Sequence, residues 1–357
     1  TRINRIDMQP IEGGYSGSSV AAVKFRSKND EELGVKGVVK VSKSLNTKTE
    51  LENYNKYVKW FLPYSWRVDV LGLGFTDKYG SVCYSFVNND GLGAITLTEL
   101  IKCGKANESI EYAINTLFNP DSKTWYGHIR SGLNDDVSEY YSRYPYVGNS
   151  ERMLDLDESL YSQLKKIANN ESYSCQKENE KMFIDKYDIT LPAYLLFSQN
   201  WGKYTECICH GDLNSGNIMC DKSLTRIAFI DFQNTGYAHV FLDFISLESS
   251  IRIYYPHNKN IDGKLNLLKM IDDEYKSLCK SWNREKIDDE YYECIRIIRL
   301  CAHNNFLNEE FRLYVYGSIV VHLWLLRMGK WTDIQCYRLI SLILAALKWL
   351  DENKNIS

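Results

Sequence analysis

The sequence predicts an α+β protein of two lobes, the first rich in β-strands and the second mainly helical. Residues 1–90 contain short runs of β-branched and aromatic residues separated by glycine turns, a pattern typical of a β-sheet. From residue 94 onward, apolar residues recur mainly at helical spacing. A polar stretch, Asn88 to Gly93, separates the two patterns. We therefore expect a boundary near residue 90, with residues 91–357 forming the second lobe.

The elements of the first lobe are expected in the order strand, strand, strand, helix, strand, strand. Two strands flank the glycine turn of "MQPIEGGYSGSSVAAVKFRS", and "KGVVKVSKS" forms a third, because β-branched residues favour strands. The segment "NTKTELENYNKYVKWFL" predicts a helix, since Leu51, Tyr54 and Val58 recur near helical spacing. A β-hairpin should follow in "RVDVLGLGFTDKYGSVCYSFV", with its turn at Asp77 to Gly80.

The second lobe should be built mainly from helices. Helical spacing occurs in Leu97–Cys103, Ser109–Leu117, Leu160–Ala168, Leu191–Phe197, 290–306, 313–329 and 336–351. Residues 118–190 show little periodicity outside one of these segments, so no further element is assigned there. The longest apolar stretch, Leu313 to Met328, is interrupted by a glycine and two polar residues, which predicts a buried helix and not a membrane span.

Composition narrows the class of protein. The chain has 357 residues and a formal net charge of -3, so it lacks the basic field that nucleic-acid binding favours. We expect neither a nucleic acid nor a membrane as a partner. Ten cysteines without regular spacing indicate reduced thiols and a cytoplasmic location. Cys207, Cys209 and Cys220 lie close in sequence, but no second ligand pair follows at zinc-site spacing, so metal binding by them is not expected. No signal peptide is visible, and a start at Thr1 is consistent with a piece of a longer protein.

The segment "HGDLNSGNI", residues 210–218, lies between two apolar runs that read as buried strands, and Asp231 follows the second run. Phosphoryl transfer needs a carboxylate near the acceptor hydroxyl, oxygen ligands for Mg²⁺, and cations or amides around the phosphates. We therefore interpret Asp212 as the catalytic base, and Asn217 and Asp231 as Mg²⁺ ligands. The alternative is that these residues cap turns in a βαβ-like connection.

The first lobe supplies matching groups for a nucleotide. Its first turn contains Gly13, Gly14, Ser16, Gly17 and Ser18, and such small residues let backbone amides approach a phosphate. Lys40 lies among valines in a strand, where an unpaired charge is costly to bury. We expect Lys40 to hold the α- and β-phosphates while a helix glutamate fixes it. Only one of Glu50 and Glu52 can do so, and Glu50 is favoured because it shares a helix face with Tyr54 and Val58.

The order of these motifs resembles the aminoglycoside phosphotransferase and choline kinase branch of the protein-kinase-like superfamily. The catalytic loop of that family reads H-G-D-x-x-x-x-N, which His210, Gly211, Asp212 and Asn217 match. Its metal-binding D-F motif falls on Asp231 and Phe232, and the aspartate that braces its catalytic loop falls on Asp243. "GGYSGSSV" and "TGYAHVFLDFISLE" are also similar to kinase-like domains of bacterial conflict systems. The resemblance implies a bilobal protein-kinase-like fold, although residues 100–200 carry almost none of it.

Departures from the family pattern favour a small-molecule kinase over a protein kinase. Protein kinases usually carry Arg before the catalytic Asp and Gly after D-F, where this chain has Gly211 and Gln233. The segment from Asp231 to Asp243 is also too short for a long activation loop. Many family members carry His where this chain has Asn214, a change that bears on substrate or metal contacts. His210 is interpreted as a residue that holds backbone by hydrogen bonds.

The resemblance implies that ATP binds in the cleft between the lobes, with adenine hydrogen-bonded to backbone near Phe86 and Asn88. With Mg²⁺ as the second cofactor, the γ-phosphoryl group would pass to a hydroxyl of a small molecule whose identity the sequence does not give. Two alternatives stay open. One is a nucleotide-binding pseudokinase that regulates a protein partner, and the other is nucleotidyl transfer to a protein.

Overall fold

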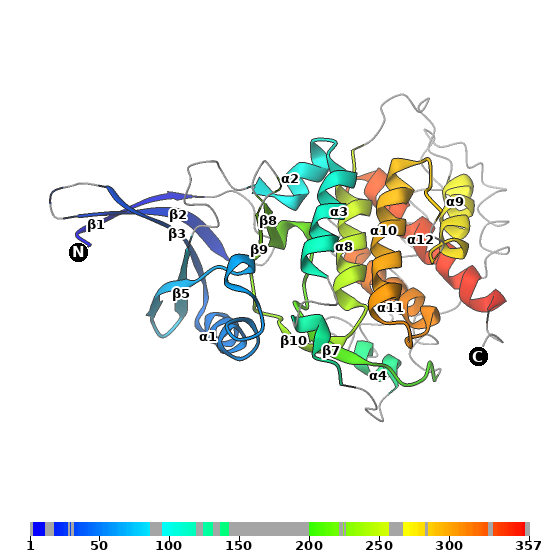
Figure 1. Cartoon of the computed structure of the whole chain (residues 1–357), viewed down its shortest axis with the longest axis horizontal. Helices are drawn as coiled ribbons and strands as arrows, with labels where there is room; N and C mark the ends of the chain where they lie inside the picture. Colours follow the sequence, from blue (N-terminus) through cyan, green and yellow to red (C-terminus); the bar gives the residue numbers. More distant parts are fainter. Residues whose placement is uncertain are drawn as a thin grey trace.

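The computed structural model describes residues 3–10, 18–27, 29, 32–85, 95–118, 124–130, 136–142, 200–220, 224, 226–256, 267–282, 285–327 and 331–353. Figure 1 shows a β-sheet at one end of the molecule and a group of helices at the other. The predicted α+β class, with the sheet in the N-terminal part and the helices after it, is confirmed. The boundary near residue 90 stays a prediction, because residues 86–94 lie outside the described part, as do the helices expected at Leu160–Ala168 and Leu191–Phe197.

The N-terminal sheet is antiparallel, with five strands in the order β1-β2-β3-β5-β4. The strands are β1 (Arg5–Pro10), β2 (Ser19–Arg26), β3 (Glu32–Lys43), β4 (Val70–Phe75) and β5 (Tyr79–Ser85). In the central strand, Lys40 is opposite Val20 on one side and Val82 on the other. Paired residues share a face of a sheet, so Lys40 projects from an otherwise apolar surface. The three predicted strands and the hairpin are confirmed, but Gly80, expected in the turn, already pairs with Phe75 in β5.

Helix α1 (Ser44–Asn53) follows β3 and continues as one turn of π-helix, η1 (Tyr54–Val58). The predicted helix is confirmed, and the π-turn is a feature that periodicity did not indicate. The hydroxyls of Ser42 and Thr47 are hydrogen-bonded to each other at 2.8 Å, and this contact links the start of the helix to the sheet. Glu50 and Tyr54 are buried on the side of α1–η1 that faces the sheet. The helix thereby brings Glu50 beside Lys40.

Two small sheets connect the N-terminal sheet to the helices. Strand β7 (Glu206–Cys209) pairs with β10 (Gly236–His239), and β8 (Ile218–Cys220) pairs with β6 (Ile95–Thr96) and β9 (Ile227–Phe229). The loop 210–217, which ends in the 3₁₀ turn η4 (Ser215–Asn217), runs from β7 to β8. Its two ends are therefore fixed in different sheets.

The C-terminal part is helical. Its helices are α2 (Leu97–Lys102), α3 (Ala106–Leu117), α4 (Val137–Ser142), α8 (Leu242–Tyr254), α9 (Leu267–Cys279), α10 (Glu290–Asn305), α11 (Phe311–Arg327) and α12 (Asp333–Glu352). Short 3₁₀ turns η2 (Tyr64–Trp66) and η3 (Trp125–Gly127) complete the described helical elements. The predicted helices near 97, 109, 290, 313 and 336 are confirmed, and the apolar stretch from Leu313 forms the buried helix α11. In the described residues no helix combines the length and the apolar character needed to cross a bilayer.

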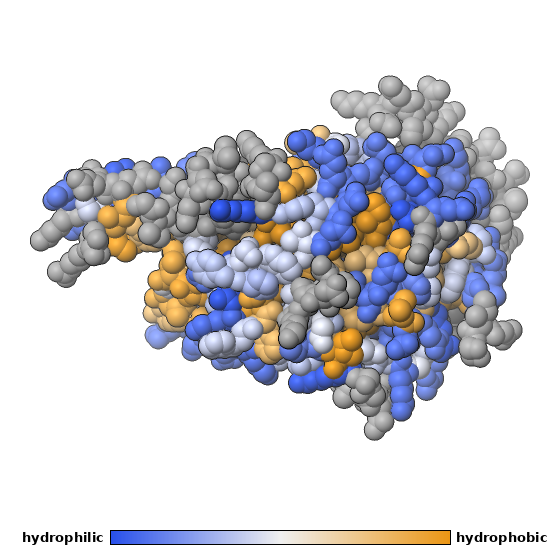
Figure 2. Space-filling view, in the orientation of Figure 1, coloured by the Kyte–Doolittle hydropathy of each residue, from blue (hydrophilic) through white to orange (hydrophobic). Residues whose placement is uncertain are grey.

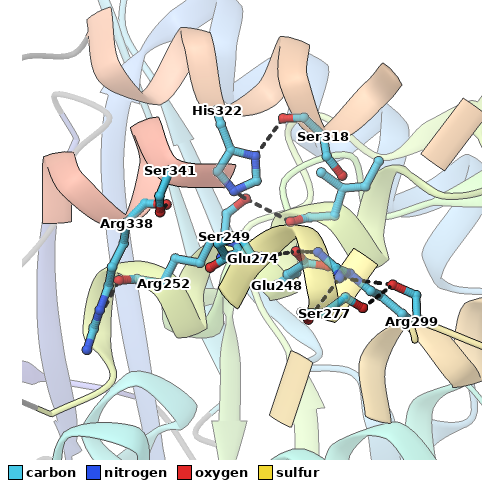
Figure 3. A network of polar contacts seen from close by, with 12 residues as sticks. Glu248, Ser249, Arg252, Glu274, Ser277, Arg299, Ser318, His322, Arg338 and Ser341 are labelled. Atoms are coloured by element: carbon cyan, nitrogen blue, oxygen red, sulfur yellow. Dashed lines mark hydrogen bonds and ion pairs between the residues drawn. The ribbon is translucent and has the colours of Figure 1, made fainter. Parts of the chain in front are cut away.

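Helix α8 packs against α2, α10, α11 and α12, and Figure 1 shows it within the group of helices. All its residues from Leu242 to Ile253 are buried, polar ones included. Glu248 accepts hydrogen bonds from Arg252 (2.6 Å), Arg299 (2.7 and 2.9 Å) and Tyr314 (2.7 Å). Arg252 also contacts Glu274 of α9, and Figure 3 shows these charged groups meeting between the helices. This buried network joins α8, α9, α10 and α11.

The N-terminal sheet leaves apolar residues uncovered. Leu71, Leu73 and Phe75 of the edge strand β4 are exposed. Figure 2 shows hydrophobic residues gathered at this end of the molecule, below the long strands of the sheet. Most residues of the buried apolar cluster come from the helical part, and only a few, such as Val82 and Tyr84, come from the sheet.

Candidate functional site

Lys40 meets two carboxylates that come from distant parts of the chain. Its Nζ lies 3.0 Å from Glu50 Oε2 and 2.6 Å from Asp231 Oδ1. Lys40 is 7% exposed and Glu50 is 1% exposed, so both charges are nearly out of water. A buried charge is stable only when it is paired, and the Lys40 ammonium is paired with two carboxylates. Glu52, the other helix glutamate, is exposed.

Tyr84 fixes Glu50 from the opposite side. Its hydroxyl donates to Glu50 Oε1 at 2.7 Å, while Oε2 of the same carboxylate contacts Lys40. Burial and the Glu50 carboxylate hold the pKa of Tyr84 well above its usual value, so the phenol stays a donor. Burial opposes the charge of Lys40, but the carboxylates of Asp231 and Glu50 outweigh it and raise the pKa of Lys40. Lys40 is therefore a fixed cation at neutral pH.

The backbone at the start of the loop is held by Asp243, at the N-terminus of α8. Its Oδ2 accepts from the backbone N–H of His210 (2.7 Å), and its Oδ1 from that of Gly211 (3.0 Å). The Tyr126 hydroxyl donates to Oδ2 of the same carboxylate at 2.8 Å. Asp243 therefore braces the loop in the way that the family resemblance implies.

Gly211 occupies a position that no other residue fits. Its φ is +82°, and a Cβ placed there would lie 2.2 Å from the backbone oxygen of Asn234. Both the left-handed backbone and the close approach require glycine. The loop can therefore pass directly over the segment that follows Asp231.

His210 holds backbone, as interpreted from the sequence. Its Nε2 lies 2.8 Å from the carbonyl oxygen of Ile230, so this nitrogen carries the proton and donates. The backbone oxygen of His210 accepts from Thr235 Oγ1 at 3.2 Å. The ring is fully buried, and these contacts tie the loop to both sides of Asp231.

Asp212 lies in the loop with its carboxylate half-buried. Asn214 Nδ2 donates to Asp212 Oδ1 at 3.1 Å, and Asn217 Nδ2 donates to the backbone oxygen of Asp212 at 2.8 Å. Burial raises the pKa of the Asp212 carboxyl, the hydrogen bond from Asn214 opposes this, and the carboxylates of Asp231 and Asp243 add to the increase. A carboxylate with a raised pKa is a better proton acceptor than an ordinary one.

Asp231 and Asn217 are the two residues expected to hold Mg²⁺. Asp231 follows β9 with a φ of +65°, and its side chain is 26% exposed. The backbone of Asn217 accepts from the N–H of Ile230 at 3.1 Å, which places the two residues next to each other. Since Asn217 Nδ2 is turned to Asp212, its Oδ1 is left for a ligand. A carboxylate and a carboxamide oxygen fit the hard ion Mg²⁺, which takes few protein ligands beside the phosphates.

The other predicted site residues are only partly described. Ser18 is described and partly exposed just before β2. Gly13, Gly14, Ser16, Gly17, Phe86 and Asn88 lie outside the described residues. Their roles at the phosphates and at adenine stay predictions, as do the catalytic and metal-binding roles of the residues that the structure brings together. Among the described residues, no group of three or more His, Cys, Asp or Glu side chains could hold a metal ion.

Sequence reasoning missed some residues of the site. Tyr84 carries no motif, although strand alternation places it on the same face as Val82 and Lys40. Tyr126 lies in a region without periodicity, and its contact with Asp243 has no local signal. The role of Asn214 beside Asp212 was visible in sequence only as a departure from the family pattern.

A model of the phosphotransferase enzyme family matches residues 144–255. This segment contains the loop 210–218, Asp231 and Asp243. The resemblance expected from the motifs is thus confirmed for this part of the chain. No curated protein matches the sequence.

Several solved structures are similar to this chain over most of its length at low identity. The aminoglycoside phosphotransferase APH(3'')-Id from Streptomyces rimosus is 14% identical, with a TM-score of 0.36, and 83% of this chain and 92% of that chain are covered. A thermostable mutant of aminoglycoside phosphotransferase APH(4)-Ia, in a ternary complex with ADP and hygromycin B, is 11% identical with a TM-score of 0.45, covering 95% and 94%. An ethanolamine kinase from Plasmodium vivax is 17% identical with a TM-score of 0.38, covering 97% and 84%.

Proposed function

We propose that this chain, whose residues 144–255 match the phosphotransferase enzyme family, is an ATP- and Mg²⁺-dependent kinase. It transfers the γ-phosphoryl group to a hydroxyl of a small molecule. The observation that carries the proposal is the meeting of Lys40 with Glu50 and Asp231, directly beside a loop that holds Asp212 and Asn217. Phosphoryl transfer is catalysed by such a set of a cation, a carboxylate and oxygen ligands.

Lys40 binds the phosphates of the nucleotide in this proposal. Its charge is permanent at neutral pH, because Asp231 and Glu50 raise its pKa. Glu50 is held by Tyr84 and stays with Lys40, whereas Asp231 is the more exposed of the two carboxylates. Asp231 is therefore the carboxylate that would hold Mg²⁺ when the nucleotide is bound, while Glu50 keeps Lys40 in place.

Asp212 accepts the proton of the acceptor hydroxyl. Its raised pKa, caused first by burial, suits this role. Asp231 and the carboxamide oxygen of Asn217 would hold Mg²⁺, which neutralises charge on the transferred phosphoryl group when bound. The half-buried setting of Asp212 limits access of water and so favours transfer to a bound acceptor.

The proposal is tested by following ATP consumption with and without Mg²⁺. A panel of amino sugars, choline-like alcohols, nucleosides and candidate proteins should be screened for phosphate uptake from labelled ATP. Asp212→Asn should lower turnover by about 10²- to 10⁴-fold, the usual contribution of a general base, while nucleotide binding measured by calorimetry persists. Asp77→Asn, which removes an exposed carboxylate in the β4–β5 turn, is the matched control and should behave like the wild type.

Three results would reject the proposal in different ways. Unchanged turnover in Asp212→Asn would remove Asp212 as the base. Nucleotide binding without Mg²⁺-dependent turnover for any acceptor would favour the pseudokinase alternative. A product that mass spectrometry finds increased by a nucleotide, and not by a phosphate, would indicate nucleotidyl transfer.

A further inference from the structure

Both ends of the Asn214 carboxamide are engaged inside the loop. Its Oδ1 accepts from the backbone N–H of Gly216 at 2.9 Å, and its Nδ2 donates to Asp212 Oδ1 at 3.1 Å. The two contacts fix the orientation of the amide, because a flipped amide would set Nδ2 against the N–H of Gly216. Asn214 is the N-cap of the 3₁₀ turn that follows, and this capping contact orients its Nδ2 toward the Asp212 carboxylate.

Asn214 holds the carboxylate of Asp212 more closely than Asn217 does. Asn217 Nδ2 is 2.8 Å from the backbone oxygen of Asp212 but 3.5 Å from its Oδ2. The second distance is at the limit of a hydrogen bond. Asn217 thus fixes the backbone at this position, and Asn214 fixes the side chain.

The fold of the loop does not depend on Asn214 alone. Asp243 holds the backbone N–H groups of His210 and Gly211, and Ser250 Oγ accepts from the backbone N–H of Ser215 at 2.8 Å. These contacts anchor the loop to α8 before and after Asp212. The hydrogen bond from Asn214 is therefore not needed to hold the backbone of the loop, and its main effect is to fix the side chain of Asp212.

We propose that Asn214 is a positioning residue for the base: it holds Asp212 Oδ1 and thereby presents Oδ2 to the acceptor hydroxyl. The inference rests on the proposed function of Asp212. An amide is suited to this task because it donates without carrying a charge and keeps the same form across the pH range.

Two substitutions separate positioning from capping. Asn214→Ser and Asn214→Asp both keep an oxygen that can cap the N–H of Gly216, since Ser and Asp are good N-cap residues. The Ser hydroxyl is on a shorter side chain than the amide and reaches the Asp212 carboxylate less well. An ionised Asp has no donor and adds a like charge beside that carboxylate. The apparent pKa of Asp212 should therefore rise from wild type to Asn214→Ser and further to Asn214→Asp.

The experiment combines a titration with kinetics. The ¹³C carboxyl signal of Asp212, assigned by its loss in Asp212→Asn, is titrated in the nucleotide-free protein for the wild type and both variants. The pH dependence of Mg²⁺-dependent ATP hydrolysis, with water as the acceptor, is measured in parallel. We expect the acidic limb of the rate profile to move to higher pH in the same order, and kcat to fall by about 10- to 100-fold. KM for ATP and the melting temperature should change little.

The results distinguish this inference from the proposed function. Identical Asp212 titrations in the three proteins would overturn the inference, and so would rate losses that follow a lowered melting temperature without a shift of the profile. Absence of Mg²⁺-dependent ATP consumption in the wild type, both with water and with every acceptor of the panel, would overturn the proposed function and with it the role of Asp212 as base, even with the titrations shifted as expected. Shifted titrations together with a shifted rate profile would support both.

Discussion

The Nζ of Lys40 lies 2.6 Å from Oδ1 of Asp231, a residue more than half the chain away in sequence. This ion pair joins the central strand of the N-terminal sheet to the segment that follows β9. Since the same nitrogen contacts Glu50 at 3.0 Å, the Lys40 ammonium links the sheet, helix α1 and the segment that follows β9. In the proposed function, where Lys40 binds the phosphates of the nucleotide, this contact couples nucleotide binding to the relative position of the two parts.

Replacing Lys40 tests this coupling. Lys40→Met keeps the length of the apolar stem but leaves Glu50 and Asp231 without their cation. We expect ATP affinity to fall by roughly 10-fold or more, because a charge-assisted contact to phosphate is worth about 1.5–3 kcal/mol. Titration calorimetry with ATP and Mg²⁺ measures the loss. Lys43→Met, at an exposed position near the end of the same strand, should bind ATP like the wild type, and equal losses in both variants would refute the assignment.

Removing the Tyr84 hydroxyl should destabilise the protein as well as weaken the site. In Tyr84→Phe, Oε1 of Glu50 loses the donor that lies 2.7 Å away and becomes a buried acceptor without that partner. Such a loss costs about 1–3 kcal/mol of unfolding free energy, and a less restrained Glu50 should raise KM for ATP. Urea unfolding measures the first effect. Tyr79→Phe, at a residue 59% exposed on the same strand, is the control. A Tyr84→Phe protein as stable as this control would contradict the prediction.

Two glycines with positive φ allow strain and steric clash to be separated. Gly104 has a φ of +77° and nothing within 4 Å of the position that a Cβ would occupy, whereas at Gly211 the Cβ would meet Asn234 at 2.2 Å. Gly104→Ala should cost only about 1 kcal/mol, the penalty of the left-handed backbone. Gly211→Ala should cost more and abolish turnover, since the loop must shift away from Asn234. Chemical denaturation measures the free energy of unfolding of the two variants. Similar losses of stability in both would show that the close approach at Gly211 is not important.

Motif order in the sequence was enough to choose the residues that meet around Lys40, but it did not give their contacts. Lys40 and Glu50 were paired on the basis of helix faces, whereas the direct contact with Asp231 depends on how the two parts of the chain pack. Helices with one apolar face, such as α10, were found because their spacing is periodic. Helix α8 was not found, because it is buried on all sides and so has no polar face to create a period.

The buried network around α8 makes stability depend on pH. Burial opposes the ionised form of Glu248, but Arg299 and Arg252 outweigh it and hold its pKa far below the usual value. His322 of α11 is also fully buried, and burial lowers its pKa from 6.5 to about 3. Its Nδ1 is hydrogen-bonded to the backbone oxygen of Ser318, and its Nε2 lies 3.3 Å from Ser249 Oγ of α8, as Figure 3 shows. His322 is therefore neutral in the folded protein at neutral and mildly acidic pH.

Acidification should destabilise the fold in two stages. Below pH 6.5 the unfolded chain binds a proton at His322 that the folded protein does not take up until about pH 3. The free energy of unfolding should thus fall by about 1.4 kcal/mol for each pH unit in this range. Below the usual glutamate pKa of 4.5, the unfolded chain also protonates Glu248, so the fall steepens. Above pH 6.5 neither group contributes a slope.

Urea unfolding of the wild type and His322→Gln between pH 7 and pH 4.5 isolates the first stage. Glutamine can donate to the backbone oxygen of Ser318 but does not titrate. The change of unfolding free energy with pH should therefore be smaller in this variant by about 1.4 kcal/mol per pH unit, the contribution of one proton. Glu248→Gln, in contrast, leaves Arg252 and Arg299 without their shared carboxylate and should cost about 3–5 kcal/mol at pH 7. If His322→Gln has the same pH slope as the wild type, His322 is not the group that carries it. If Glu248→Gln is as stable as the wild type, the network does not hold α8 in place.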